Sequence, residues 1–188
     1  MKPLRVRPMR DADVDEWMAM YVDEDVQTNI NHQGGVTAPD ELRAQVRVWL
    51  TGRSGRLYFR IGTGGGDLVG FAWLTKLDWI SQRCGLTVMV APRHRNRLGL
   101  LAHIAMYNHI YDALNLRVVV HEVLSGNEMM RSEEHYRSRA QAISPDHCFT
   151  VGVRRTCYWW AETRADHHAI LARTAARGAK VRQRLGKA

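Results

Sequence analysis

Residues 86–130 read LTVMVAPRHRNRLGLLAHIAMYNHIYDALNLRVVVHEVLSGNEMM, and they decide the fold. The short apolar runs Leu86–Val90 and Val118–Leu124 are typical of buried β-strands. Between them, apolar residues recur at three- and four-residue steps over Leu100–Leu114, which predicts a helix. A basic turn, Arg93–Gly99, joins the first strand to this helix. The stretch therefore predicts a strand–helix–strand unit.

The basic turn is suited to bind an anion. The N–H groups in the first turn of a helix have no intrahelical partner, and the helix dipole favours negative charge there. Arg93, Arg95 and Arg97 add positive charge to the turn. We therefore expect a phosphate-bearing ligand at this position, and a merely solvated basic loop is the alternative.

The rest of the chain predicts further strands and helices. The predicted strands are Leu4–Pro8, Arg56–Ile61, Leu68–Leu77, Phe149–Trp160 and Arg164–Ala172. The predicted helices are Val14–Tyr21 after Asp11 as N-cap, Thr37–Leu50, and Glu128–Ala140, while Asp23–Gly35 is expected to be an irregular loop. The glycine-rich segment Gly62–Asp67 is expected to be a hairpin turn, because no helical pattern follows it to complete a phosphate site.

This order of elements resembles the GNAT acyltransferase superfamily over residues 4–172. The resemblance is carried by the opening Leu4–Pro8 with Asp11–Asp13, by Leu68–Ala72 and by the basic turn. Gly152–Arg155, followed by Asp166, resembles the closing hairpin of the branch that acetylates the N-termini of ribosomal proteins. The resemblance implies an α/β (α+β) fold, in which helices flank a mixed central β-sheet with a splayed parallel strand pair.

The resemblance also implies an N-acetyltransferase that uses acetyl-CoA as co-substrate and acts by direct attack of a primary amine in a ternary complex. By position, Met89 and Val90 would offer backbone groups to pantetheine. The residues expected around the pyrophosphate are Arg95, Asn96, Arg97, Gly99 and Leu100. Asn127 resembles the asparagine that follows the core strand in the family.

Tyr136 is the expected general acid for the thiolate leaving group. It follows Ser132 by four residues, about one helical turn, which matches the family's spacing. A structural tyrosine is the alternative. The expected general base is Glu122 acting through water, with His121 as the second candidate, because both residues interrupt an otherwise apolar strand. Asp146-His147 is a further candidate, and a salt bridge at the strand end is the alternative role for Glu122 or His121.

Three acceptors fit this reading: a small-molecule amine, a protein N-terminus or an aminoacyl-tRNA. One alternative is a GNAT-fold enzyme that modifies nucleic acid, which the basic tail favours. A second alternative is a catalytically degenerate GNAT that serves as a binding module. Two departures favour it: Gly99 stands one residue out of the family's glycine pattern, and Leu86–Val90 contains no carboxylate.

The net charge of +8 is concentrated at the C-terminus. Seven basic residues and one acidic residue follow residue 163. A cationic segment of this kind can bind nucleic acid or another polyanion, whereas a solvated helical extension is the alternative. We therefore divide the chain into an acyltransferase domain, residues 1–173, and a basic tail, residues 174–188.

The remaining composition narrows the class of protein. The chain has no apolar run of transmembrane length and no secretory signal at its start, so we expect a cytoplasmic protein, monomeric or homodimeric. Its three cysteines are not spaced as a disulfide framework. Its nine histidines form no zinc pair on a predicted helix, so no metal site is predicted.

Overall fold

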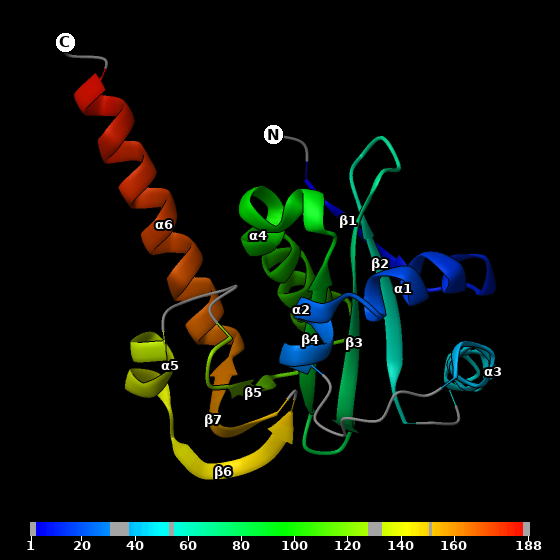
Figure 1. The fold of residues 1–188 in the computed structure, drawn as a ribbon. Coiled ribbons are helices and arrows are strands. Elements are labelled where there is room, and N and C mark those ends of the chain that lie inside the picture. The colour runs from blue at the N-terminus through cyan, green and yellow to red at the C-terminus, as the bar shows by residue number, and fades with distance from the viewer. Residues whose placement is uncertain (1–2, 31–37, 53–54, 128–132, 151, 186–188) are drawn as a thin grey trace.

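A computed structural model describes residues 3–30, 38–52, 55–127, 133–150 and 152–185. Figure 1 shows a curved β-sheet with helices on both faces. The strands are β1 Arg5–Pro8, β2 Leu57–Gly62, β3 Leu68–Asp78, β4 Arg83–Val90, β5 Val118–Leu124, β6 Ala142–Thr150 and β7 Val153–Thr163. The helices are α1 Val14–Tyr21, α2 Glu24–Ile30, α3 Pro39–Leu50, α4 Arg95–Asn108, α5 Glu133–Arg139 and α6 Arg164–Leu185. A π-helical turn, His109–Ala113, extends α4.

The seven strands form one mixed sheet in the order β1-β2-β3-β4-β5-β7-β6. Neighbouring strands are antiparallel except for β4 and β5, which are parallel and joined by α4. The predicted fold class, a mixed sheet flanked by helices with one parallel pair, is confirmed.

The parallel pair β4–β5 separates after three residue pairs. Arg83–Gly85 pair with Val118–Val120, and the two strands then diverge. Beyond that point, β4 remains paired with β3 and β5 remains paired with β7. The facing edges of Leu86–Val90 and His121–Leu124 therefore have no strand between them, which opens the sheet at its centre.

Side chains alternate between the two faces of the sheet, and both faces of the central strand β3 are buried by helices over most of its length. On β3, Phe71 and Trp73 pack with residues of α1, α2 and α3. Ala72 and Leu74 point to the opposite face and pack with α4. Each face has its own apolar core, and the two cores hold the diverging strands in place.

The predicted final strand Arg164–Ala172 is wrong, because these residues begin the 22-residue helix α6. The reason is a capping box: the Asp166 carboxylate accepts from the Thr163 backbone N–H at 2.9 Å, and the Asp166 N–H donates to the Thr163 hydroxyl at 3.2 Å. The closing hairpin is instead β6 with β7.

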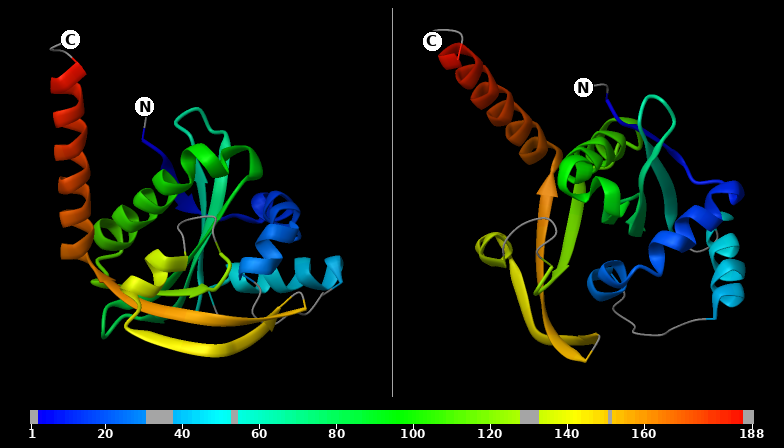
Figure 2. Two further views of the ribbon diagram at one scale, coloured as in Figure 1. Left: turned by 60° about the vertical axis from the view of Figure 1, so that its left-hand side comes forward. Right: turned by 45° about the horizontal axis from the view of Figure 1, so that its top comes forward.

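Figures 1 and 2 show α6 extending away from the sheet. The predicted domain boundary at residue 173 falls within this helix, which continues to Leu185.

Three further local predictions differ from the structure. The expected loop from Asp23 contains α2, whose start is met by the Asp23 carboxylate at 3.4 Å from the Val26 N–H. The helix expected from Leu100 begins five residues earlier, at Arg95. Asp11 is not the N-cap that the sequence predicts; the Asp13 carboxylate accepts the Arg10 N–H at 2.8 Å.

Other predictions concern residues that the structure does not describe. Of the predicted helix Glu128–Ala140, the described part is α5, while Ser132 and the predicted cap Thr37 lie outside the described residues. Within the described part of the chain, no helix is long and apolar enough to cross a membrane.

Candidate active site

A cavity of about 770 Å³ lies where β4 and β5 diverge. Its walls come from both strands and from α2, α4, α5, β7 and the start of α6. Most of the predicted site residues line it: Met89, Val90, Arg95, Gly99, Leu100, His121, Glu122, Asn127 and Tyr136. The side chains of Asn96 and Arg97, the two other predicted residues, lie outside the described part of the structure.

The N-terminus of α4 opens toward this cavity. Its N-cap residue, His94, makes no side-chain capping bond, and its first turn contains no acidic residue. The Arg95 N–H donates to the Pro92 carbonyl, so the N–H groups that follow it in this turn are the ones that suit an anion. Gly99 is not among the described glycines with a positive φ, so it serves here as a helical residue without a side chain rather than as a left-handed turn.

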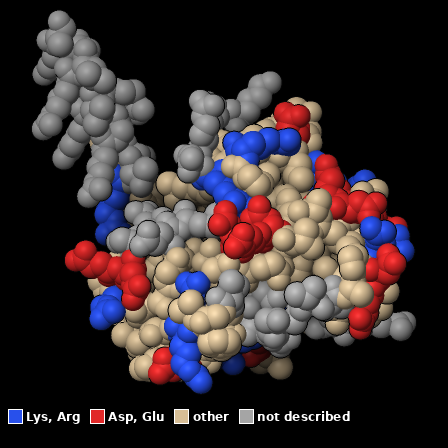
Figure 3. All heavy atoms as spheres, viewed as in Figure 1, with Lys and Arg blue, Asp and Glu red and all other residues tan. Residues whose placement is uncertain are grey.

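Arg95 is held by acidic residues in this structure. Its guanidinium lies 2.6 Å from Asp23 and 2.5 Å from Asp25, and its Nε donates to the Val90 carbonyl at 3.3 Å. Figure 3 shows the acidic patch over α2 beside neighbouring basic atoms. Arg95 thus ties α2 to the start of α4, so a phosphate contact from this side chain requires exchange with the two carboxylates.

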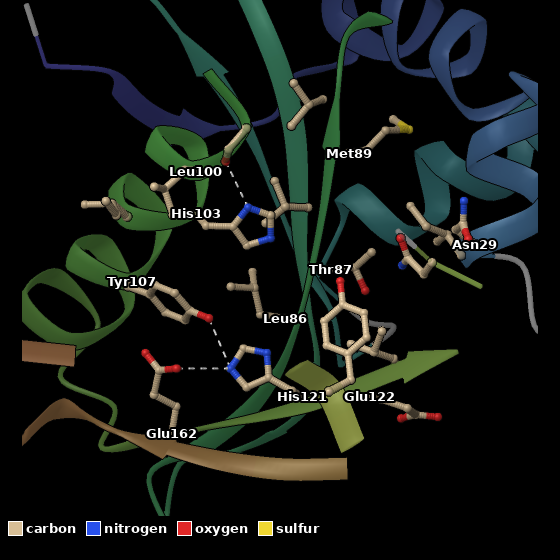
Figure 4. A pocket seen from close by; sticks show the side chains of 18 of the residues that line it. Asn29, Leu86, Thr87, Met89, Leu100, His103, Tyr107, His121, Glu122 and Glu162 are labelled. Atoms are coloured by element: carbon tan, nitrogen blue, oxygen red, sulfur yellow. Dashed lines mark hydrogen bonds and ion pairs between the residues drawn. The ribbon is translucent and has the colours of Figure 1, made fainter. Parts of the chain in front are cut away.

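A buried polar network forms the inner wall of the cavity (Figure 4). The His121 Nε2 lies 3.1 Å from the Tyr107 hydroxyl and 3.9 Å from the Glu162 carboxylate. Arg139 donates to the same Glu162 oxygen at 3.3 Å. His103, on the next turn of α4, lies with its Nδ1 3.0 Å from the Gly99 carbonyl.

Burial sets the protonation states of this network. Desolvation lowers the pKa of His121 to about 3, and the nearby His103 and Arg139 contribute in the same direction, so the ring is neutral. Burial raises the pKa of Glu162, although Arg139 opposes that shift. A buried carboxylate with a raised pKa is a better proton acceptor than an exposed one.

Three aromatic rings stack along the wall formed by β5, β7 and α5. Trp160 lies between His121, at 4.6 Å between ring centroids, and Tyr136, at 5.9 Å. Both pairs are nearly parallel, at 9° and 16°. Tyr136 is 3% exposed and its ring is fixed by this stacking. The predicted general acid therefore lies on the cavity wall in a defined orientation.

Two buried polar atoms at the cavity have no hydrogen-bond partner among the residues that the structure describes. They are the Asn127 Oδ1 and the Trp160 Nε1. Leaving a buried polar group unpaired is costly, so such atoms indicate a place where a ligand binds. An unpaired acceptor on Asn127 suits an amide N–H, which the pantetheine arm of CoA contains.

The two predicted bases lie on opposite faces of β5. His121 faces α4 (Figure 4). The Glu122 carboxylate instead lies 2.6 Å from the Lys76 Nζ. This follows from the alternation of side chains along a strand. Glu122 contributes to the cavity rim, and the buried polar network belongs to His121.

Sequence reasoning missed Glu162, Tyr107 and Arg139. Glu162 shares a face of β7 with Tyr158 and Trp160, as alternation along a strand requires. The sequence contains that alternating pattern, but the predicted strand Phe149–Trp160 ends three residues before the end of β7 at Thr163. Extending it to Thr163 would have placed a carboxylate on the buried face.

The family comparison matches most of the chain. The profile of the acetyltransferase (GNAT) domain matches residues 4–132. No curated protein matches the sequence.

Solved structures share the fold at low sequence identity. Spermidine N-acetyltransferase from Vibrio cholerae, in complex with CoA and spermine, has a TM-score of 0.75 and 13% identity, covering 87% of this chain and 97% of that chain. A putative acetyltransferase from T. thermophilus has a TM-score of 0.69 and 18% identity, covering 94% of both chains.

Proposed function

The chain belongs to the GNAT acetyltransferase family and is an N-acetyltransferase that uses acetyl-CoA; we propose that it acetylates the primary amine of a small molecule by direct attack in a ternary complex. The observation that carries this proposal is the cavity at the divergence of β4 and β5. It offers unpaired strand edges to the cofactor and carboxylates, of which Glu162 is buried, to the acceptor.

The cofactor is proposed to lie along β4 with its pyrophosphate at the start of α4. The Ala91 N–H donates to the Val69 carbonyl, so the backbone groups of Met89 are on the β3 side and those of Val90 lie on the open edge of β4, where they would bind the pantetheine arm. Asn127 would accept an amide N–H from that arm, because its side-chain oxygen is buried without a partner among the described residues. The uncapped first turn of α4 would hold the phosphates through backbone N–H groups.

The acceptor is proposed to be a small cationic amine. Three carboxylates line the cavity: Asp25, Glu122 and Glu162. Each is paired with a basic side chain in this structure: Asp25 with Arg95, Glu122 with Lys76 and Glu162 with Arg139. Opposite charges attract, so an ammonium group of the acceptor would take the place of such a partner. The similar solved structures include a spermidine N-acetyltransferase, which supports a small-molecule acceptor over the protein N-terminus that the ribosomal-protein branch implies.

Transfer begins when the acceptor ammonium loses a proton, since an ammonium has no lone pair. We favour Glu162, acting through water, over Glu122 and His121 as the group that receives it. Glu162 is buried and has a raised pKa, whereas the Glu122 carboxylate is paired with Lys76. The neutral His121 ring would position water between the amine and Glu162.

The amine nitrogen then attacks the thioester carbonyl carbon, a C–N bond forms and the C–S bond breaks. The leaving CoA thiolate takes a proton from the Tyr136 hydroxyl, and the proton that the attacking nitrogen loses as the amide forms returns to Tyr136 through water. Holding both reactants in one cavity makes the attack effectively unimolecular, which removes much of the entropic barrier.

Calorimetry with acetyl-CoA, followed by acetyl-transfer assays, tests this function. We expect saturable acetyl-CoA binding and turnover with a polyamine such as spermidine. Two further arms use a peptide with a free N-terminus and an aminoacyl-tRNA. Turnover with the peptide alone would support the ribosomal-protein branch instead, and binding without turnover on any amine would favour the degenerate binding module.

The basic tail is the basis of the second candidate function, action on nucleic acid. The cavity residues of α6 are His167, Ile170 and Leu171, and the His167 Nε2 lies 2.9 Å from the Asn108 Oδ1 of α4. These three cavity residues of α6 all precede residue 173.

We therefore expect truncation after Arg173 to leave the affinity for acetyl-CoA unchanged. The truncated protein should elute from heparin at a lower salt concentration, because fewer cations engage the polyanion. Elution of both forms at one salt concentration would remove the support for a polyanion site in the tail.

A further inference from the structure

A second cluster of reactive side chains lies where β5, β6 and β7 run side by side. The Glu122 carboxylate, a ring nitrogen of His147 and the Cys157 thiol bring their ligand atoms within 4.8 Å of one another. We propose that these three side chains bind a divalent metal ion of the zinc type, at the rim of the acetyl-transfer cavity.

The strand register places two of the ligands on one face of the sheet. Leu124 pairs with Cys157, and Glu122 pairs with Trp159. Residues directly opposite in an antiparallel pair share a face, and so do residues two apart on one strand. Glu122 and Cys157 are therefore diagonal neighbours on a common face, and both are held by regular β-structure.

An irregularity in β6 brings the third ligand to this face. Ser144 pairs with Cys157 and Cys148 pairs with Arg155, so residues 145–147 lie opposite the single residue Thr156. Asp146, within this bulge, has a φ of 49°, which is uncommon for a residue other than glycine. Bulges redirect side chains and occur preferentially beside functional sites. Here the bulge places His147, which stays exposed, with its ring 4.9 Å from that of Trp159.

The three ligand types together are characteristic of zinc. Thiolate, imidazole and carboxylate all bind Zn²⁺, whereas Ca²⁺ and Mg²⁺ prefer oxygen ligands alone. Tetrahedral coordination separates neighbouring ligand atoms by roughly 3.3–3.8 Å. Small rotations of the side chains would close the remaining gap. Three protein ligands leave the fourth position for water or an exogenous group.

The ion pair between Glu122 and Lys76 does not prevent metal binding. Lys76 is mostly exposed, with 68% of its side chain accessible, so water screens the pair and it is readily exchanged. A metal ion would take the place of the ammonium group. Cys157 would bind as thiolate and release its proton to solvent.

This site leaves no local pattern in the sequence, because its ligands come from three strands separated by turns and a helix. The prediction of no metal site was made from spacings on one helix, and such spacings detect only ligands that are close in sequence. The site does not depend on the proposed acetyl transfer, since metal binding can be measured without any acceptor amine.

Titration of the full-length, reduced and metal-stripped protein tests the proposal. We expect one Zn²⁺ to bind per chain in competition with a chromophoric chelator. Co²⁺ in the same site should give the near-ultraviolet absorption of a thiolate–cobalt bond. His147→Ala, at an exposed position, and Glu122→Gln should each weaken Zn²⁺ at least tenfold, and Cys157→Ser should abolish the thiolate–cobalt band.

Matched controls use a cysteine and a histidine outside the cluster. Cys84→Ser, in the core beneath α4, and His168→Ala, exposed on α6, should leave the affinity and the cobalt spectrum unchanged. The proposal is overturned if the native chain binds no Zn²⁺ more tightly than His147→Ala does, or if the thiolate–cobalt band is absent. His147→Ala keeps the test decisive if Cys157→Ser does not fold.

Discussion

Tyr136→Phe is expected to lower the turnover number by about 10²–10⁴-fold, the usual contribution of a general acid. The dissociation constant of acetyl-CoA should remain nearly unchanged. The phenylalanine ring keeps the stacking on Trp160, while the proton donor on the cavity wall is lost. Steady-state kinetics with a saturating amine, together with calorimetric binding of acetyl-CoA, separates the two quantities.

Tyr158→Phe is the matched control for this prediction. Tyr158 belongs to the same aromatic cluster and is equally buried, but its hydroxyl donates to Glu133 at 2.7 Å and it does not line the cavity. Loss of this hydroxyl should change the free energy of unfolding and leave the turnover number close to that of the native protein. Equal turnover in Tyr136→Phe and the native chain would reduce Tyr136 to a structural residue.

The parts of the fold that sequence reasoning predicted are those with local signals. β4, α4 and β5 follow from two apolar runs and one helical periodicity, which a window of a few residues contains. The hairpin between β2 and β3 follows from a glycine-rich turn. Asn115 ends the helical segment with a φ of 54°, in the left-handed region that asparagine tolerates. These features require no knowledge of distant contacts.

The parts that were missed depend on capping or on tertiary contacts. The start of α6 was predicted as the second strand of a closing hairpin, and the Thr163–Asp166 capping box that starts the helix was not recognised. The pairing of Arg95 with Asp23 and Asp25 was not predicted, because these carboxylates lie 72 and 70 residues away in sequence. The role proposed for Glu162 depends on the pairing of β7 with β5, which brings its carboxylate to 3.9 Å from the His121 Nε2.

Gly70→Ala is expected to be the most damaging single substitution to the fold. A Cβ atom at Gly70 would lie 2.2 Å from the Met89 carbonyl oxygen and 3.1 Å from the Val90 Cα. Both obstacles are backbone atoms of β4, so rotation of a side chain relieves neither. Overpacking in a well-packed core costs about 1–3 kcal/mol, occasionally more, and this case should reach the upper end. Unfolding in urea, followed by circular dichroism, measures the loss.

The same substitution tests whether β4 is the cofactor strand, because β3 holds β4 in place through the pairing of Gly70 with Val90. Gly99→Ala provides the contrast. Apart from the adjacent residues and backbone of its own helix, no described atom lies within 4 Å of the position that its methyl group would take. Alanine is favoured over glycine in a helix by about 0.5–1 kcal/mol. We expect Gly99→Ala to be at least as stable as the native chain, and Gly70→Ala to lose both stability and acetyl-CoA affinity. If Gly70→Ala stays folded and binds acetyl-CoA with native affinity, β4 can move away from β3 without disturbing the cofactor, and the placement of pantetheine along Met89 and Val90 is wrong.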